Sequence, residues 1–178
     1  LWYCSSDVCS SNLDQPSPPS PLVQKTKSTP LGNIEQPVNP VGLALMAGAT
    51  FVARGFSGDA KGVASLVQKG IEHKGFSMID VQSPCVTYNK LNTYDWFRER
   101  VYNLQEQNHN TEDFGAAVTR AIEWPTVGPE DKVPVGIFYQ TQKPTYEEGE
   151  RAYKVGNPAK RTLQMTRSQR DTLMAELY

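Results

Sequence analysis

Two short apolar runs, at residues 50–55 and 76–81, flank a segment in which apolar residues recur at three- and four-residue steps. Each run has the length and composition of a buried strand. The segment between them predicts a helix that begins at 57–59 and ends at Gly75. Its recurring apolar residues are Val63, Leu66, Val67 and Ile71. A strand, a helix and a second strand joined so closely indicate the βαβ unit of a parallel sheet.

A further helix is predicted just before the first strand. Asn39 is a good N-cap residue, and Pro40 suits the first helical position. The run from Val41 to Ala47 is apolar with small residues and stops at Gly48, which is typical of a helix packed closely on a sheet.

Residues 91–178 have a different character, richer in aromatic and charged side chains. The pattern predicts helices over 93–104, from 110–113 through Ile122, and over 168–177, with a strand over 133–139. The first of these helices would carry an apolar face of Trp96, Phe97, Val101 and Leu104. Its aromatic residues could form a surface that docks a partner, but a small satellite core is the favoured interpretation. Residues 140–178 give no indication of a role.

The start of the chain shows no pattern of regular structure. Residues 2–13 resemble a sequencing adapter translated as protein, and the first residue is Leu1 rather than Met, so we expect residues 1–13 to be disordered and the chain to be truncated. Cys4 and Cys9 in this stretch could be read as a metal-binding pair, but no second pair of ligands follows.

Residues 14–40 are rich in proline and predict an extended loop. Within it, Lys25–Thr29 is either a solvated turn or a lid over an anionic ligand.

Cys85 follows the strand predicted at 76–81, in a loop that begins Gln82-Ser83-Pro84. In open parallel sheets, functional residues gather just beyond the carboxyl ends of the strands. A cysteine at that place is a candidate metal ligand or nucleophile. The alternative is a buried apolar thiol, since cysteine is among the most buried residue types.

Composition narrows the classes of function. The 18 Lys and Arg residues nearly balance the 19 Asp and Glu, for a formal net charge of −1, so we expect neither nucleic acid nor an anionic membrane as a partner. The longest apolar stretch, 38–56, is interrupted by polar residues and glycines and is unsuited to spanning a bilayer. The three cysteines do not suggest a disulfide framework, and no signal-peptide pattern is present, so a cytoplasmic location is expected.

Four segments in order carry a resemblance to a known family. They are 25–40 (KTKSTPLGNIEQPVNP), 49–56 (ATFVARGF), 76–89 (FSMIDVQSPCVTYN) and 94–102 (YDWFRERVY). Together they resemble the carboxy-terminal part of the β subunits of 2-oxoacid:ferredoxin oxidoreductases. The similarity runs from Asp14 to about Tyr139, with a looser tail after it.

The resemblance implies an α/β fold: the carboxy-terminal part of a parallel-sheet domain that binds thiamine diphosphate, at residues 14–90, followed by a small α+β extension at 91–178. It implies oxidative decarboxylation of a 2-oxoacid on thiamine diphosphate and Mg²⁺, with electrons passing through a 4Fe-4S cluster to ferredoxin and the acyl group passing to coenzyme A. An α subunit is the implied partner. Cys85 is similar to the family's fourth cluster ligand, and thiolates are the usual ligands of such clusters.

The chain departs from the family pattern in what it lacks. Three family features would lie upstream of the matching residues: the other three cluster cysteines, the Gly-Asp-Gly motif that holds Mg²⁺ and diphosphate, and a lysine that contacts the substrate. The position of that lysine corresponds to Leu13. We therefore expect the chain alone to be inactive and to retain no residue that binds thiamine diphosphate. No residue of the chain is assigned a catalytic role. 2-Oxoglutarate is the favoured substrate, with a pyruvate or branched-chain variant, or a non-catalytic docking module, as alternatives. His73 and His109 are expected to be exposed and without a role.

Overall fold

The computed structural model describes residues 30–32, 38–84, 86, 92–123, 132–150 and 165–175, and the backbone of 2–5. The chain divides into two compact units, Leu1–Lys143 and Pro144–Tyr178. The first unit contains β1 (Trp2–Ser5), α1 (Pro40–Met46), β2 (Phe51–Phe56), α2 (Ala60–Glu72), β3 (Ser77–Gln82), α3 (Tyr94–Arg100), β4 (Val101–Asn103), a 3-10 turn (Gln105–Gln107), α4 (Phe114–Ala121) and β5 (Val133–Gln140). The second contains α5 (Tyr146–Gly149) and α7 (Arg167–Ala175).

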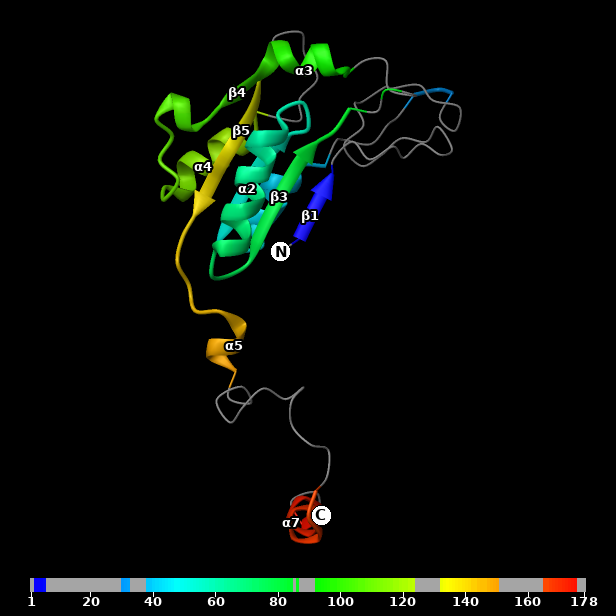
Figure 1. Cartoon of the computed structure of the whole chain (residues 1–178), viewed down its shortest axis with the longest axis vertical. Coiled ribbons are helices and arrows are strands. Elements are labelled where there is room, and N and C mark those ends of the chain that lie inside the picture. The colour runs from blue at the N-terminus through cyan, green and yellow to red at the C-terminus, as the bar shows by residue number, and fades with distance from the viewer. Residues whose placement is uncertain are drawn as a thin grey trace. The chain divides into compact units, whose positions relative to one another are not determined.

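The strands of the first unit form one mixed sheet in the order β1-β3-β2-β5-β4 (Figure 1). β1, β3 and β2 run parallel to one another, β5 runs antiparallel to β2, and β4 runs parallel to β5. The parallel pairing of β2 with β3 around α2 confirms the βαβ unit predicted from the sequence. The architecture agrees with the α/β class that the resemblance implied.

The two helices predicted around β2 begin where their capping residues place them. The side chain of Asn39 accepts a hydrogen bond from the backbone N–H of Gly42, and Asp59 does the same for Gly62. Each cap satisfies one of the N–H groups that a helix start leaves open. The chain turns into β3 at Gly75, whose φ of +137° suits a residue without a Cβ.

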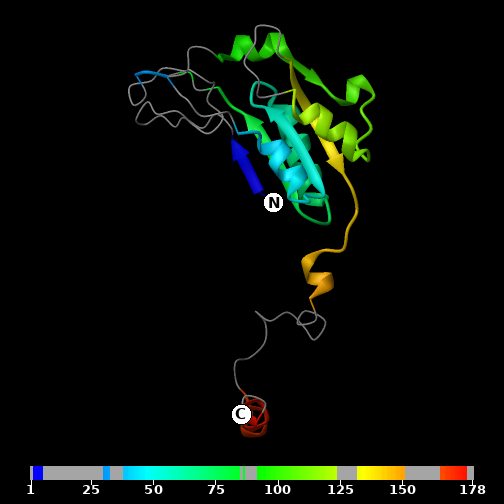
Figure 2. The same ribbon diagram turned by 180° about the vertical axis from the view of Figure 1, so that it is seen from behind.

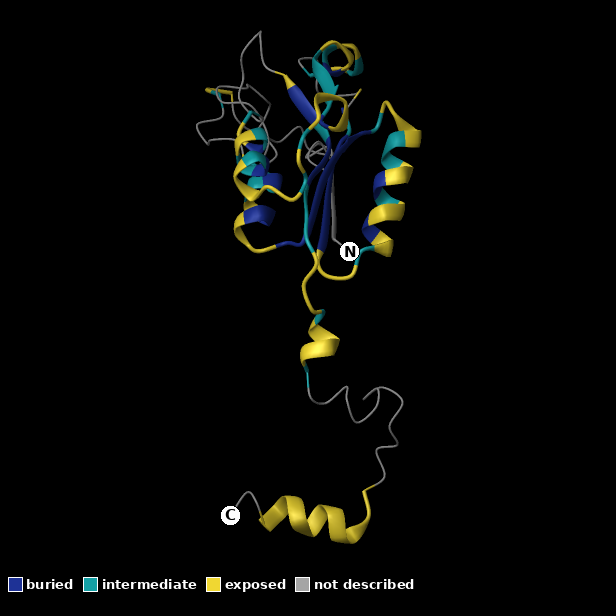
Figure 3. Cartoon of the chain, turned by 90° about the vertical axis from the view of Figure 1, so that its left-hand side faces the viewer, coloured by how far each residue is buried: buried dark blue, intermediate teal, exposed yellow. Residues whose placement is uncertain are grey.

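Helices cover both faces of the sheet, so that β2 and β3 are buried on both sides (Figure 3). α1 and α4 cover one face, which Figure 2 brings to the front, and α2 covers the other. The core on the α1 and α4 face includes Val52, Met78 and Phe138, and the core under α2 includes Phe51 and Ile79. This alternation along β2 and β3 follows from the two-residue period of a strand.

The segment expected to form a separate extension from residue 91 contributes two strands to this same sheet. β5 pairs with β2 along Phe51–Arg54, with an irregularity between Val52 and Ala53. The described residues 38–84, 92–123 and 132–143 therefore share one sheet and belong to one unit, Leu1–Lys143.

The helix predicted over 93–104 ends earlier, at Arg100, and this prediction was wrong for its last turn. Val101 has extended backbone and pairs with Val133 as the start of β4. Trp96 and Phe97 do face inward: Phe97 is fully buried and stacks on Phe56 at 5.4 Å between ring centroids, and Trp96 packs edge-on against it. The aromatic stretch forms the satellite core that the sequence favoured.

Residues 1–13 showed no strand pattern, and for residues 2–5 the expectation of disorder was wrong. This short segment pairs in parallel with β3, from Trp2 beside Met78 to Ser5 beside Val81. Strand pairing uses backbone groups, so a segment can extend a sheet edge without alternating side chains. Cys9 lies outside the described residues.

In the second unit, α7 confirms the helix predicted near the carboxyl end. None of its residues is buried, and Leu173 and Met174 are about half exposed. α5 begins with a capping box in which Thr145 and Glu148 exchange side-chain and backbone hydrogen bonds. In the described part of the chain, no helix has the length and apolar character needed to span a membrane.

Both histidines are only partly exposed and hold backbone or side-chain partners, so the expectation that they are exposed was wrong. His109 Nε2 lies 2.7 Å from the carbonyl oxygen of Phe138 in β5. His73 Nε2 lies 2.9 Å from Thr50 Oγ1, and that hydroxyl also donates to the carbonyl and accepts from the N–H of Phe76. These contacts tie the end of α2 to the starts of β2 and β3.

Replacing Gly136 with alanine should destabilise the sheet at β5. Gly136 has a φ of +111°, and a Cβ there would lie 2.1 Å from Gln105 Oε1. Gln105 cannot move freely, because its side-chain amide donates to the carbonyl and accepts from the N–H of Ile137. We expect Gly136→Ala to lower the free energy of unfolding by roughly 1–3 kcal/mol in urea titrations. Gly149→Ala, where φ is ordinary and a Cβ meets nothing within 4 Å, is the control and should change it little.

His73 should make stability depend on pH near neutrality. Burial lowers its pKa from the ordinary 6.5, and its Nδ1 is buried without a partner in the described structure. A histidine with a depressed pKa stabilises the fold in its neutral form, so this contribution is present above about pH 6.5 and is lost as pH falls below it. NMR titration of the His73 ring should give a midpoint below 6.5, and His73→Gln should flatten this part of the pH–stability curve. A midpoint at or above 6.5 would contradict the prediction.

Candidate functional site

The site residues predicted from the sequence fall largely outside the described structure. Cys85 and the segment Lys25–Thr29 both lie outside the described residues. The residues that lead to Cys85 are described: β3 ends at Gln82, and Ser83 and the buried Pro84 follow. The loop therefore leaves the carboxyl end of a buried parallel strand, which is where open α/β sheets place functional residues.

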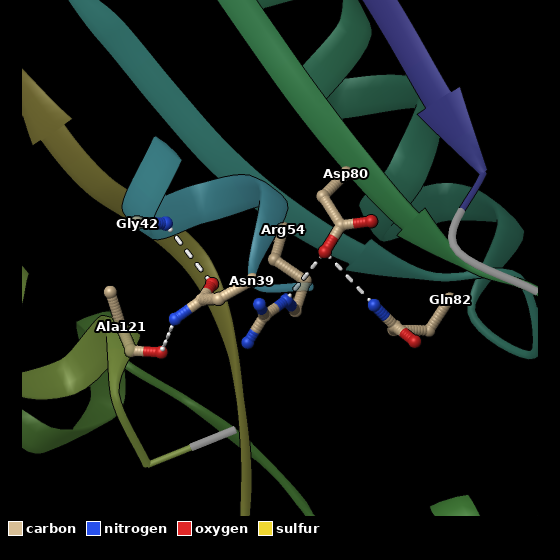
Figure 4. A network of polar contacts seen from close by, with 6 residues as sticks. All are labelled: Asn39, Gly42, Arg54, Asp80, Gln82 and Ala121. Atoms are coloured by element: carbon tan, nitrogen blue, oxygen red, sulfur yellow. Dashed lines mark hydrogen bonds and ion pairs between the residues drawn. The ribbon is translucent and has the colours of Figure 1, made fainter. Parts of the chain in front are cut away.

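An ion pair lies inside the sheet close to that end. Arg54 of β2 and Asp80 of β3 are direct neighbours in the strand register, and both side chains are fully buried. Arg54 Nε donates to Asp80 Oδ2 at 2.8 Å, and Gln82 Nε2 donates to the same oxygen at 2.9 Å (Figure 4). The guanidinium lies 5.4 Å from the ring centroid of Phe138, so an aromatic face adds to its surroundings.

Much of this polar cluster has no hydrogen-bond partner. Within the described structure, Arg54 Nη1, Arg54 Nη2 and Asp80 Oδ1 are all buried and unpaired. A buried polar group left unpaired costs about 1–3 kcal/mol, and more when it is charged. Buried ion pairs are seldom a net source of stability over apolar residues of similar size. The cluster is therefore a stronger candidate for a binding role than for a purely stabilising one.

Asn39 joins the two helices on the same face of the sheet. Its Oδ1 caps α1 through Gly42, and its Nδ2 donates to the carbonyl oxygen of Ala121 at the end of α4, at 2.7 Å (Figure 4). One amide thus satisfies an open N–H at one helix start and an open carbonyl at another helix end. This contact fixes α1 against α4 above the strands that carry Arg54.

A cavity of about 260 Å³ lies on the side of the sheet that α2 covers. Residues of β4 and β5 contribute to its lining, which is mostly apolar and includes three charged residues, Arg54, Asp59 and Lys69. Small-ligand sites usually measure about 300–1,000 Å³, so this cavity is at the small end. The carboxylate of Asp59 is already used to cap α2.

A second polar cluster joins β4 to the end of α4. Tyr102 donates a hydrogen bond to Glu123 Oε2, and Arg120 Nη1 donates to Glu123 Oε1 at 2.7 Å. Burial and the neighbouring carboxylate raise the pKa of Tyr102 to about 12. The phenol therefore stays neutral at physiological pH and acts as a donor, which indicates a structural clasp between strand and helix.

Metal-ligand geometry is not found in the residues that the structure describes: no group of three or more His, Cys, Asp or Glu side chains comes together there. A 4Fe-4S cluster is usually held by four cysteine thiolates, and the whole chain has three cysteines, two of them within the first nine residues. The chain's own residues therefore do not form a complete cluster site, and Cys85 could supply one ligand of four.

The sequence held a signal for the Arg54–Asp80 pair that hydrophobic periodicity alone does not reveal. Each residue is the single charge in its strand, and each lies fourth in a six-residue strand. Parallel strands paired from their first residues place these positions side by side. Opposite charges at matched positions of two buried strands indicate a buried pair, since lone charges are rarely buried.

A family model described as the C-terminal part of the pyruvate ferredoxin oxidoreductase beta subunit matches residues 85–155. The chain is 38% identical to a 2-oxoacid:ferredoxin oxidoreductase subunit beta of Sulfolobus sp. over 156 residues, which are 82% of this chain and 48% of the relative. It is 39% identical over 145 residues to the protein of the same name from Saccharolobus solfataricus, covering 75% of this chain and 46% of the relative. It is also 39% identical over 75 residues to the 2-oxoglutarate oxidoreductase subunit KorB of Mycobacterium tuberculosis. These residues are 42% of this chain and 20% of that relative.

A solved structure agrees with the sequence matches. The 2-oxoglutarate:ferredoxin oxidoreductase from Magnetococcus marinus, with 2-oxoglutarate, coenzyme A and succinyl-CoA bound, superimposes with a TM-score of 0.74 at 33% identity. The match covers 89% of this chain and 52% of that chain. The chain thus spans about half the length of the relatives it matches. By sequence and by fold, the chain belongs to the family of 2-oxoacid:ferredoxin oxidoreductase β subunits.

Proposed function

We propose that this chain is part of the β subunit of an enzyme that oxidatively decarboxylates a 2-oxoacid, transfers the electrons to ferredoxin and forms an acyl-CoA. The observation that carries the proposal is the similarity to named β subunits over most of the chain, 82% of it for the Sulfolobus relative. The shared fold, with a TM-score of 0.74 to an enzyme of this class, supports it independently. Thiamine diphosphate, Mg²⁺ and a 4Fe-4S cluster belong to the proposal as cofactors of the whole β subunit.

2-Oxoglutarate is the proposed substrate. The relative from Mycobacterium tuberculosis is named for 2-oxoglutarate, and the matching solved structure has 2-oxoglutarate, coenzyme A and succinyl-CoA bound. The Sulfolobus relative is named only for 2-oxoacids, and the matching family model is named for pyruvate, so pyruvate is the competing substrate. The proposed enzyme also contains an α subunit.

The feature that suggested the alternative of a non-catalytic docking module also serves the chain's own core. That feature was the aromatic stretch from Tyr94 to Tyr102. Tyr94 packs on Phe56 at 5.7 Å, and Phe97 is fully buried, so these rings serve the chain's own core. Tyr94, Trp96 and Tyr102 keep part of their surface exposed, but each also packs against or bonds to the chain's own residues.

The proposed activity can be tested in a chimera. Residues 14–178 replace the matching part of the Sulfolobus β subunit, and the chimera is produced with the Sulfolobus α subunit. We expect reduction of ferredoxin that depends on both coenzyme A and a 2-oxoacid, with 2-oxoglutarate turned over faster than pyruvate. Residues 14–178 alone, as the control, should show no activity. A chimera that assembles with the α subunit but reduces ferredoxin with no 2-oxoacid would refute the proposal.

Cys85 is proposed as one thiolate ligand of the cluster, and the same chimera tests it. Residues 14–178 contain no other cysteine, so Cys85→Ser removes their only thiol. We expect the variant to lose the visible absorbance of the cluster and most of its iron, and ferredoxin reduction to fall by at least about tenfold. Ser83→Ala, two residues away in the same loop, is the matched control and should keep both. Full iron content in Cys85→Ser would exclude a ligand role.

A further inference from the structure

We propose that the guanidinium of Arg54 is an oxyanion-binding fork, in which Nη1 and Nη2 together bind two oxygens of a carboxylate or a phosphate group. This inference goes beyond the proposed function, because neither the fold nor the names of the relatives assign a ligand to Arg54. It starts from the unusual state of the cluster: a fully buried arginine that uses one of its hydrogen-bond donors.

The geometry of the ion pair leaves the outer edge of the guanidinium buried but without a hydrogen-bond partner in the described structure. Asp80 contacts Arg54 through a single oxygen, Oδ2, on Nε alone, and does not form the two parallel hydrogen bonds that arginine and carboxylate can make. The two terminal nitrogens point away from that carboxylate (Figure 4). Of the five N–H groups of an arginine, four therefore have no partner in the described structure.

The chemistry of the open groups selects the class of ligand. The cluster holds four open N–H donors on Arg54 and one open acceptor, Asp80 Oδ1. Because hydrogen-bond donors outnumber acceptors here, the matching ligand is a group with several hydrogen-bond acceptors. A charged guanidinium binds carboxylate and phosphate oxygens most strongly. A planar fork matches the spacing of two oxygens on one such group, whereas an ammonium group binds only as a point charge.

The surroundings hold the fork in one orientation before any ligand arrives. Arg54 Nε is fixed by Asp80, whose Oδ2 is fixed in turn by Gln82 at 2.9 Å. The ring of Phe138 lies 5.4 Å from the guanidinium carbon. Both charged residues come from the middle of paired strands, whose backbones are hydrogen-bonded to each other. Little conformational freedom is left to lose on binding, which favours affinity.

The position in the fold also fits a ligand site. Arg54 and Asp80 each lie two residues before the carboxyl end of a parallel strand, and β3 leads directly to the Ser83-Pro84 loop. Ligands of open α/β sheets bind beyond these strand ends. Because both side chains are fully buried in the chain, a bound group would be enclosed and shielded from water. Electrostatic contacts are stronger in such surroundings.

The test follows the guanidinium directly by NMR. The whole chain, labelled with ¹⁵N, is titrated with inorganic phosphate, succinate or 2-oxoglutarate at constant ionic strength, with sodium chloride as the reference. The Nε–Hε signal of Arg54 is identified by through-bond assignment and by its loss in Arg54→Lys. We expect a saturable shift of this signal and a rise in the melting temperature with at least one anion. Phosphate alone would identify a phosphate ligand, and the two carboxylates alone a carboxylate ligand.

Two variants separate the fork from the general charge of the chain. Arg54→Lys keeps the charge and removes the fork, so the anion should bind at least about tenfold more weakly. Arg98→Lys is the matched control, because Arg98 is exposed and pairs with Asp95 at 2.7 Å. The affinity of this variant for the anion should differ from that of the wild type by less than about twofold.

A wild-type Arg54 signal that shifts with none of the three anions would overturn the inference, and the cluster would then be a structural ion pair completed by buried water. Equal affinity in wild type and a folded Arg54→Lys would overturn it as well. If Arg54→Lys does not fold, the wild-type titration decides by itself. The proposed enzyme activity is measured separately in the chimera, so either proposal can fail without the other.

Discussion

The buried pairing of Arg54 with Asp80 is the constraint around which the sheet is arranged. A charged residue can occupy the middle of a buried strand only if an opposite charge faces it, and here the strand register provides one. A slip of one residue between β2 and β3 would separate the pair and turn their apolar side chains to the wrong faces. The ion pair and the two-sided core therefore specify the same register, and that register sets where the loop toward Cys85 leaves the sheet.

β5 completes what the βαβ unit alone cannot provide. Two parallel strands and α2 leave one edge of β2 open, and β5 closes it while carrying Phe138 over the guanidinium of Arg54. The 3-10 turn can approach β5 this closely because Gly136 has no side chain. The part of the chain with its own, more aromatic composition is thus needed to bury the charged centre of the other part. In this chain the region after residue 91 therefore contributes two strands, β4 and β5, to the same sheet as β2 and β3.

The sequence predicted the elements whose signals are local. The caps at Asn39, Asp59 and Asp113 place three helix starts correctly, and the apolar runs place β2, β3 and β5. It failed where a distant partner decides the outcome. Val101 continues a helical pattern but becomes a strand because Val133 offers it backbone partners, and residues 2–5 pair with β3 without any pattern of their own. Of the candidate site, the place of the Cys85 loop was predicted, whereas the Arg54 cluster was not, because single charges in apolar runs say nothing about pairing until two strands are aligned.

The energetic balance of the cluster argues that its present form is not selected for stability. An apolar pair at positions 54 and 80 would satisfy the same register and the same packing without leaving buried donors unpaired. The pair costs desolvation, and the contact with Gln82 offsets only part of that cost, since it satisfies an oxygen already bonded to Arg54. Such an arrangement is advantageous when the open groups act on something that the apolar alternative could not hold. The same reasoning distinguishes this cluster from the one at Tyr102, where Glu123 accepts from Tyr102 and pairs with Arg120, and this stabilising clasp needs no ligand.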